Sequence, residues 1–183
     1  MRFFLVLVLV LPTGSALADT PRVVAPGSVE PVPFPGHRTE VLSHQHDTPA
    51  GTAVLELSLP PRTFGAPPHV HSREDEHFYV LEGQVDFLDR GEVVTAGTGS
   101  LVVLPRGHLH GFWNDHDEPA RLLLIISPGD FVDFFDEVVA DIRRTHADNP
   151  QAVGELIARA AAARGVEIHF DKVPPSAVHL LPH

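Results

Sequence analysis

The chain contains no cysteine among its 183 residues. The fold therefore gains nothing from a disulfide bond, and burial of apolar side chains has to stabilise it. Thiolates are equally unavailable for catalysis or for binding a metal, so any metal site has to be built from histidine and carboxylate side chains. A chain of this length can bury a sufficient core, and the length predicts one domain.

Basic side chains are also scarce. The sequence has 13 Lys and Arg against 24 Asp and Glu, which gives a formal net charge of −11 at pH 7. A surface with this charge repels nucleic-acid phosphates and anionic lipid headgroups. We therefore expect neither a nucleic acid nor a membrane surface as a partner.

The longest apolar run stands at the N-terminus, and it is short. Phe3 to Leu11 is continuously apolar, but a membrane-spanning helix needs about 20 such residues. Arg2 before the run and Ala16-Leu17-Ala18 after it complete the pattern of a secretory signal peptide over residues 1–18, cleaved near Ala18. The pattern predicts a secreted or periplasmic protein, and a retained membrane anchor is the alternative.

Short alternating segments follow a Pro- and Val-rich stretch. Residues 19–38 have no helical period and are expected to form an extended arm that is ordered only if it docks. Between residues 39 and 128, segments such as TAVLELSLP (52–60) alternate apolar and polar side chains and end at Gly, Pro or Asp. Many short strands without intervening helices predict an all-β sandwich or small barrel.

The period changes after Pro128-Gly129. Phe131, Phe134, Phe135, Val138, Val139 and Ile142 recur at helical spacing, with Asp130 as the expected N-cap. A second helix is expected from the Asn149 cap to Gly165. We expect a helical appendage over residues 129–170, in which the aromatic stripe packs into the core, and a flexible tail over residues 171–183.

Candidate metal ligands gather in PPHVHSREDEHFYVLEG (67–83). His69 and His71 are two residues apart, so in a strand both side chains point to the same face. Pro67-Pro68 cannot continue a ladder of hydrogen bonds, and the strand is expected to begin there. Glu76 lies at an odd offset from His71, so residues 72–75 have to turn the chain before Glu76 can join the histidines.

A second segment, GSLVVLPRGHLHGFWN (99–114), changes how this pair is interpreted. Together the two segments resemble the two motifs of the cupin superfamily. In the first, His69-Val70-His71 is followed by Glu76 and Gly83; in the second, Gly99, Pro105, Gly107, His110 and Asn114 keep the expected spacing. The resemblance covers about residues 41–127.

The resemblance implies a double-stranded β-helix, the small jelly-roll barrel of single-domain cupins. It also implies that His69, His71, Glu76 and His110 hold one divalent metal ion. Three imidazoles and a carboxylate suit Fe, Mn, Co, Ni, Cu or Zn, and the ligands do not select among these ions. A homodimer is a further implication of the resemblance.

Side chains on the ligand-bearing faces are candidates for a substrate pocket. Strand parity places Phe78, Val80 and Phe112 on the inner face, where they would suit a planar apolar substrate or simply fill the core. His108 shares the parity of His110 and is a further candidate. Asn114 is expected to hold a turn.

The C-terminal pattern is similar to that of bacterial quercetin 2,3-dioxygenase-like proteins. This resemblance implies a metal-dependent oxidoreductase that cleaves a flavonol-like or other enolic aromatic substrate with O₂, with Glu76 as the catalytic base. Two alternatives stay open at this point: an oxygen-independent isomerase, decarboxylase or lyase, and a cupin that binds a small molecule without catalysis.

Overall fold

The computed structural model of the protein describes residues 21–181, and the predicted signal peptide lies outside this range. Within the range, the strands are β1 (Arg38–Ser43), β2 (Ala53–Leu59), β3 (Thr63–His71), β4 (Asp75–Glu82), β5 (Gln84–Asp89), β6 (Glu92–Gly97), β7 (Leu101–Leu104), β8 (His110–Asn114), β9 (Ala120–Ser127) and β10 (Val166–Ile168). The α-helices are α1 (Asp133–Thr145) and α2 (Pro150–Ala163), and the turns of 3₁₀-helix are η1 (Gln45–Asp47), η2 (Gly129–Val132), η3 (Phe170–Lys172) and η4 (Val178–Leu180). No helix in residues 21–181 is long and apolar enough to cross a membrane.

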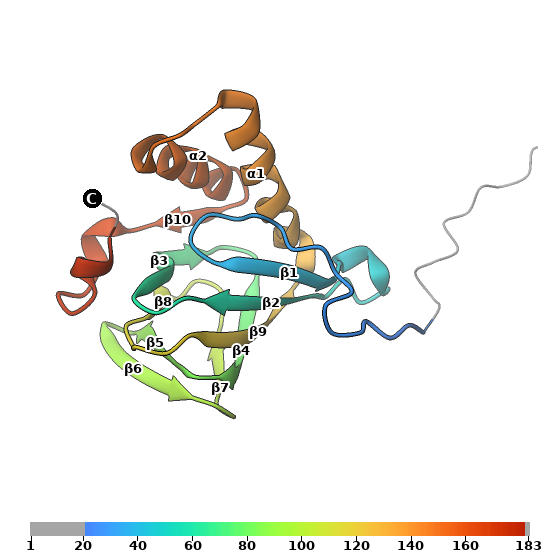
Figure 1. Cartoon of the computed structure of the whole chain (residues 1–183), viewed down its shortest axis with the longest axis horizontal. Coiled ribbons are helices and arrows are strands. Elements are labelled where there is room, and N and C mark those ends of the chain that lie inside the picture. Colours follow the sequence, from blue (N-terminus) through green and yellow to red (C-terminus); the bar gives the residue numbers. More distant parts are fainter. Residues whose placement is uncertain (1–20, 182–183) are drawn as a thin grey trace, which may run out of the picture.

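Two five-stranded antiparallel sheets form the body of the protein (Figure 1). The first sheet has the order β1-β2-β9-β4-β7, and the second has the order β10-β3-β8-β5-β6. Both helices lie together at one end of the barrel, with α2 beside β10 (Figure 1). The prediction of an all-β cupin-like barrel with two C-terminal helices is confirmed.

Strands β2 and β9 are interior strands of the first sheet, and both have an alternating sequence. Their ladder runs from Ala53 opposite Ile126 to Leu59 opposite Ala120. Every second residue of both strands is buried, in register with the apolar positions of the sequence. The apolar faces of both sheets share one core, which removes large side chains from water.

Strand β3 corrects one prediction. It begins at Thr63, before Pro67-Pro68, where the sequence led us to expect its start. The prolines are tolerated because the pairing of β3 with β8 shifts register between Ala66 and His69, so the ladder is already interrupted there. Pairing resumes with His69 opposite His110, which brings two predicted ligands side by side.

The C-terminal segment is more than a helical appendage. Strand β10 pairs with β3, with Val166 opposite His71 and Ile168 opposite His69. The prediction of Asp130 as the N-cap of the first helix is wrong, because the chain already forms η2 there and the N-cap of α1 is Val132. The Asn149 cap of α2 is confirmed: its side chain accepts a hydrogen bond from the Ala152 amide.

Parts of the arm and of the tail pack onto the barrel. In the arm, Val32 forms an isolated bridge with Thr39, and Phe34 packs against the main core. In residues 171–181, Ala177 is fully buried and packs in a second cluster with Leu88 and Trp113. This part of the tail is therefore packed, contrary to the prediction of a flexible tail.

Candidate metal centre

The structure brings the four predicted ligands together. His69 and His71 come from β3, His110 from β8 in the same sheet, and Glu76 from β4 in the opposite sheet. One donor atom from each lies within 4.8 Å of the others, and all four residues are buried. The bend between β3 and β4 carries the chain from one sheet to the other, which resolves the odd offset of Glu76 in the sequence.

Hydrogen bonds define the protonation of two of the imidazole rings. Nδ1 of His69 donates to the carbonyl oxygen of Pro67 at 2.8 Å, and Nδ1 of His110 donates to that of His108 at 3.0 Å. A carbonyl oxygen can only accept, so Nδ1 carries the proton in both rings. In the neutral rings, Nε2 then has a free lone pair, which is the form that binds a metal.

His71 is oriented by a side chain instead of the backbone. Its Nδ1 donates to Oε2 of Glu74 at 3.1 Å, and both side chains are buried. Carboxylates that hold the far nitrogen of a ligating histidine fix the ring and raise its basicity. The sequence analysis did not identify Glu74 and assigned residues 72–75 to a turn. The spacing of three residues between His71 and Glu74 was the one feature that could have indicated the contact.

The donor atoms repel one another unless a cation lies among them. Nε2 of His69 is 3.1 Å from Nε2 of His71, and Nε2 of His110 is 3.1 Å from Oε2 of Glu76. With Nδ1 protonated, these contacts bring lone pairs and a carboxylate face to face. A divalent transition ion removes the repulsion, and three imidazoles with one carboxylate are ligands that such ions accept. The residues present therefore fit a metal.

The pKa values follow from burial and from this crowding. Burial, together with the neighbouring His110 and His71, lowers the pKa of His69 to about 3. Burial also disfavours a charged His71, but Glu76 and Glu74 outweigh it and raise the pKa of that ring. Without a metal, a proton on His71 is thus the other way to relieve the repulsion.

The pKa of the Glu76 carboxyl group is lowered, although the group is buried. Burial alone would raise its pKa, but His71, His110 and His69 overcome that effect and lower the pKa to about 2. Glu76 is therefore an anion at neutral pH, as a metal ligand has to be.

Three of the four side chains, His69, His71 and Glu76, line a cavity of about 670 Å³. Its volume is in the range of sites that enclose small molecules. Aromatic side chains make up much of the wall: Phe34, Phe64, Phe112, Phe131, Phe134, Phe135 and Phe170. His71 contacts the wall directly, since its ring lies 4.7 Å from that of Phe131 in an edge-on arrangement.

The predicted pocket residues have different positions. Phe112 lines the cavity, whereas Phe78 and Val80 are not among its lining residues and are fully buried in the core. His108 is exposed and is likewise not part of the wall, because its ring is drawn back to the Arg106 carbonyl by Nδ1. The alternation of side chains along a strand identified the residues on its inner face. It could not tell which of these residues line the cavity beside the candidate ligands and which are buried in the core.

Other lining residues come from parts of the chain that the sequence assigned to different roles. Phe131, Phe134 and Phe135 belong to the main core, as predicted for the aromatic stripe, and they also line the cavity. Phe34 and His37 come from the arm. Asn114 holds a turn, as predicted, because its amide donates to the carbonyl oxygens of Pro60 and Glu118.

Comparison with known proteins agrees with this geometry. A family model described as the cupin domain matches residues 55–126, which include all four candidate ligands. Among solved structures, the chain is similar to the polyketide cyclase RemF from Streptomyces resistomycificus, with 25% identity and a TM-score of 0.51 over 58% of this chain and 79% of that chain. It is also similar to a predicted oxalate decarboxylase from Thermotoga maritima, with 22% identity and a TM-score of 0.50 over 57% of this chain and 97% of that chain.

A sugar phosphate isomerase of the cupin superfamily from Silicibacter pomeroyi is 24% identical, with a TM-score of 0.46. That match covers 51% of this chain and only 60% of the isomerase. No curated protein matches the chain.

Proposed function

We propose that the chain, whose residues 55–126 match the cupin-domain family model, is a metal-dependent enzyme that acts on a planar, largely apolar small molecule. The carrying observation is that one cavity is lined both by the buried ligands His69, His71 and Glu76 and by a wall rich in phenyl rings. Such a wall favours an aromatic substrate body, and the ligand cluster favours an oxygen-bearing group at its reacting end.

The proposed reaction is the oxidative cleavage of a flavonol-like enol with dioxygen as co-substrate. A divalent transition ion bound by the four ligands would supply Lewis acidity toward the substrate oxygen. The chain's own part is to bind the apolar body against the Phe rings and to exclude water from the reacting end. Both atoms of dioxygen would form bonds to the two carbons that flank the hydroxyl-bearing carbon, the two C–C bonds to that carbon would break, and it would leave as carbon monoxide.

Glu76 is the group proposed to receive the hydroxyl proton. Its Oε2 atom contacts Nε2 of His110 at 3.1 Å and Nε2 of His71 at 3.5 Å. Within residues 21–181, no side chain bonds to its second oxygen, Oε1, which is therefore free to accept a proton. Because the surrounding imidazoles lower the pKa of this carboxyl group to about 2, transfer to it requires that substrate binding displace some of those contacts.

An oxygen-independent reaction is the second candidate. The similarity to a polyketide cyclase at 25% identity and a TM-score of 0.51 favours it, because a cyclase needs no oxidant. In that case the same cavity would fold a flexible apolar substrate against the aromatic wall, and Glu76 would move a proton without net oxidation. Binding without turnover is the remaining, non-catalytic alternative.

Incubation of metal-loaded protein with quercetin in air tests the proposal. We expect oxygen uptake at an electrode and loss of the flavonol absorbance, both absent in His69→Ala. Turnover that persists under strict exclusion of oxygen would favour the oxygen-independent reaction. Tight binding of quercetin without any chemical change, in air or under nitrogen, would favour the binding protein.

A further inference from the structure

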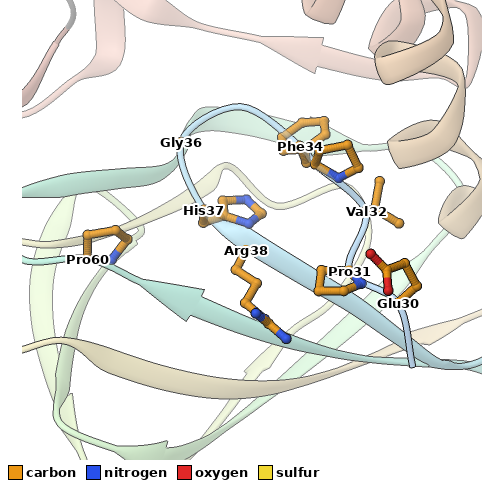
Figure 2. A pocket seen from close by; sticks show the side chains of 9 residues that line it. Glu30, Pro31, Val32, Phe34, Gly36, His37, Arg38 and Pro60 are labelled. Atoms are coloured by element: carbon orange, nitrogen blue, oxygen red, sulfur yellow. The ribbon is translucent and has the colours of Figure 1, made fainter. Parts of the chain in front are cut away.

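His37 is a buried imidazole that the metal centre does not use. It belongs to the arm, immediately before β1, and only 6% of its surface is exposed. Its side chain lines the cavity that contains the candidate ligands. It also lines a second depression of about 480 Å³ formed mainly by residues 30–38, so it stands between the cavity and the outer surface. Figure 2 shows the ring beneath the loop of Phe34 and Gly36, with Arg38 extending away from it.

Aromatic rings connect His37 to the metal centre. The His37 ring lies 5.3 Å from that of Phe34 and 6.4 Å from that of Phe135. Phe135 lies 6.1 Å from Phe131, whose ring contacts the ligand His71 at 4.7 Å. The cavity wall therefore has the candidate metal ligands at one place and His37 at another, with phenyl rings between them.

The ring of His37 has one side-chain hydrogen bond and a backbone contact with Arg38. Nδ1 lies 3.0 Å from the hydroxyl oxygen of Thr39, which is fully buried. In the part of the chain that the structure describes, no side chain bonds to Nε2. Burial lowers the pKa of His37 to about 4, against a smaller opposing effect of the Arg38 backbone. The ring is therefore neutral at pH 7, and a neutral ring in an apolar wall can form a hydrogen bond without the cost of burying a charge.

We infer that His37 is a substrate-binding residue that forms a hydrogen bond with a hydroxyl or carbonyl group remote from the reacting end of the substrate. This inference rests on the proposed function and specifies it further. The substrate would carry two polar groups separated by a planar apolar body, one at the metal ligands and one at His37. A site that hydrogen-bonds a substrate group discriminates against analogues that lack the group, because its own buried polar atom is then left unpaired.

A pair of flavonols tests the inference. Quercetin and 3-hydroxyflavone share the enol and ketone expected at the metal centre, but 3-hydroxyflavone lacks the remote hydroxyl groups. Equilibrium dialysis under nitrogen measures binding to metal-loaded protein without oxidation. We expect His37→Phe to weaken quercetin binding by roughly 5- to 10-fold and to leave 3-hydroxyflavone binding unchanged. His37→Gln, which keeps a hydrogen-bonding group, should recover part of the loss.

Thr39→Val provides a second variant in case His37→Phe does not fold. It leaves the imidazole in place but removes the hydroxyl that orients it, so we expect a smaller loss that is again selective for quercetin. Equal losses for both flavonols, or no loss for either, would overturn the role of His37. Failure of the native protein to bind either flavonol would also overturn it.

Failure of the proposed reaction has a different signature. If quercetin binds with the expected dependence on His37 but is not consumed in air, the dioxygenase is wrong and the role of His37 stands. If quercetin is consumed while His37→Phe affects both flavonols alike, the reaction stands and the role of His37 is wrong.

Discussion

The imidazole of His71 donates a hydrogen bond from Nδ1 to Oε2 of Glu74 at 3.1 Å, in a part of the barrel where both side chains are buried. The other nitrogen of the ring lies 3.1 Å from Nε2 of His69. One carboxylate thus fixes a ring whose other nitrogen faces the remaining candidate metal ligands.

Removal of Glu74 should weaken metal binding without removing a ligand. We expect Glu74→Ala to lower metal affinity by roughly 10- to 100-fold, because the His71 ring loses the bond that orients it and raises its basicity. Glu74→Gln should lose less, since its amide oxygen can still accept from Nδ1. Competition with a chelator measures the affinities, and Glu92→Ala, which removes an exposed carboxylate of β6, is the matched control. Equal affinities in Glu74→Ala and Glu92→Ala would contradict the orienting role.

Loss of a candidate ligand and loss of the proposed base should have different effects on metal content and on turnover. His110→Ala removes an imidazole that contacts Glu76 at 3.1 Å, and we expect metal content after dialysis to fall sharply. Glu76→Gln keeps an oxygen donor but cannot accept the hydroxyl proton, so it should retain part of the metal and lose turnover. Elemental analysis and the quercetin assay measure the two effects. Full activity of Glu76→Gln would show that another group takes the proton.

His37 should make the folding free energy depend on pH. Its pKa is about 4 in the folded chain against 6.5 for the free side chain, mainly because of burial. The unfolded chain therefore takes up the proton first, and the stability contributed by neutral His37 is complete above pH 6.5 and is lost as the pH falls toward 4. Between pH 7 and pH 5 the loss is about 2 kcal/mol.

Urea unfolding of metal-free protein measures this dependence. His37→Phe has no group to titrate there, so its stability should fall less between pH 7 and pH 5 than that of the native chain. The metal ligands titrate in both proteins, and their contribution cancels in the comparison. Parallel pH profiles would mean that His37 is protonated as readily in the folded chain as in the unfolded one.

Gly65 should be intolerant of a side chain. A Cβ atom at this position would overlap the ring of Phe112, which is packed against Phe78 at 4.9 Å and cannot easily move. We expect Gly65→Ala to cost about 1–3 kcal/mol of unfolding free energy, as overpacked cores do, and to narrow the cavity that both residues line. Gly97→Ala is the control, since its Cβ would meet no atom within 4 Å. Similar urea midpoints for the two variants would contradict the predicted overlap.

The sequence was sufficient to predict the barrel, because the barrel depends on local patterns, and the resemblance to the cupin motifs selected the four candidate ligands that the structure brings together. Alternation gives the buried faces of β2 and β9, and the similarity to the cupin motifs implies His69, His71, Glu76 and His110 as candidate ligands. The residues of the cavity wall were harder to predict from the sequence. Phe34 and His37 reach the wall from the arm, and no local sequence pattern indicates such long-range packing. The same reason explains why β10 and the packed tail were missed.

Position along a strand was also insufficient to place pocket residues. Phe78 and Phe112 share an inner face, but only Phe112 lines the cavity. The difference depends on where the C-terminal helices close the barrel, which strand parity does not encode. Export and the homodimer stay predictions from the sequence, and the candidate ligands do not select one metal among the six.

Elemental analysis of the purified chain is the most direct test of the metal centre. The protein should be exposed separately to Fe, Mn, Co, Ni, Cu and Zn ions, dialysed, and analysed beside the double variant His69→Ala, His110→Ala. We expect about one ion per native chain for at least one of these metals and essentially none in the variant. A native chain that retains none of the six ions, or a variant that retains as much as the native chain, would contradict the account.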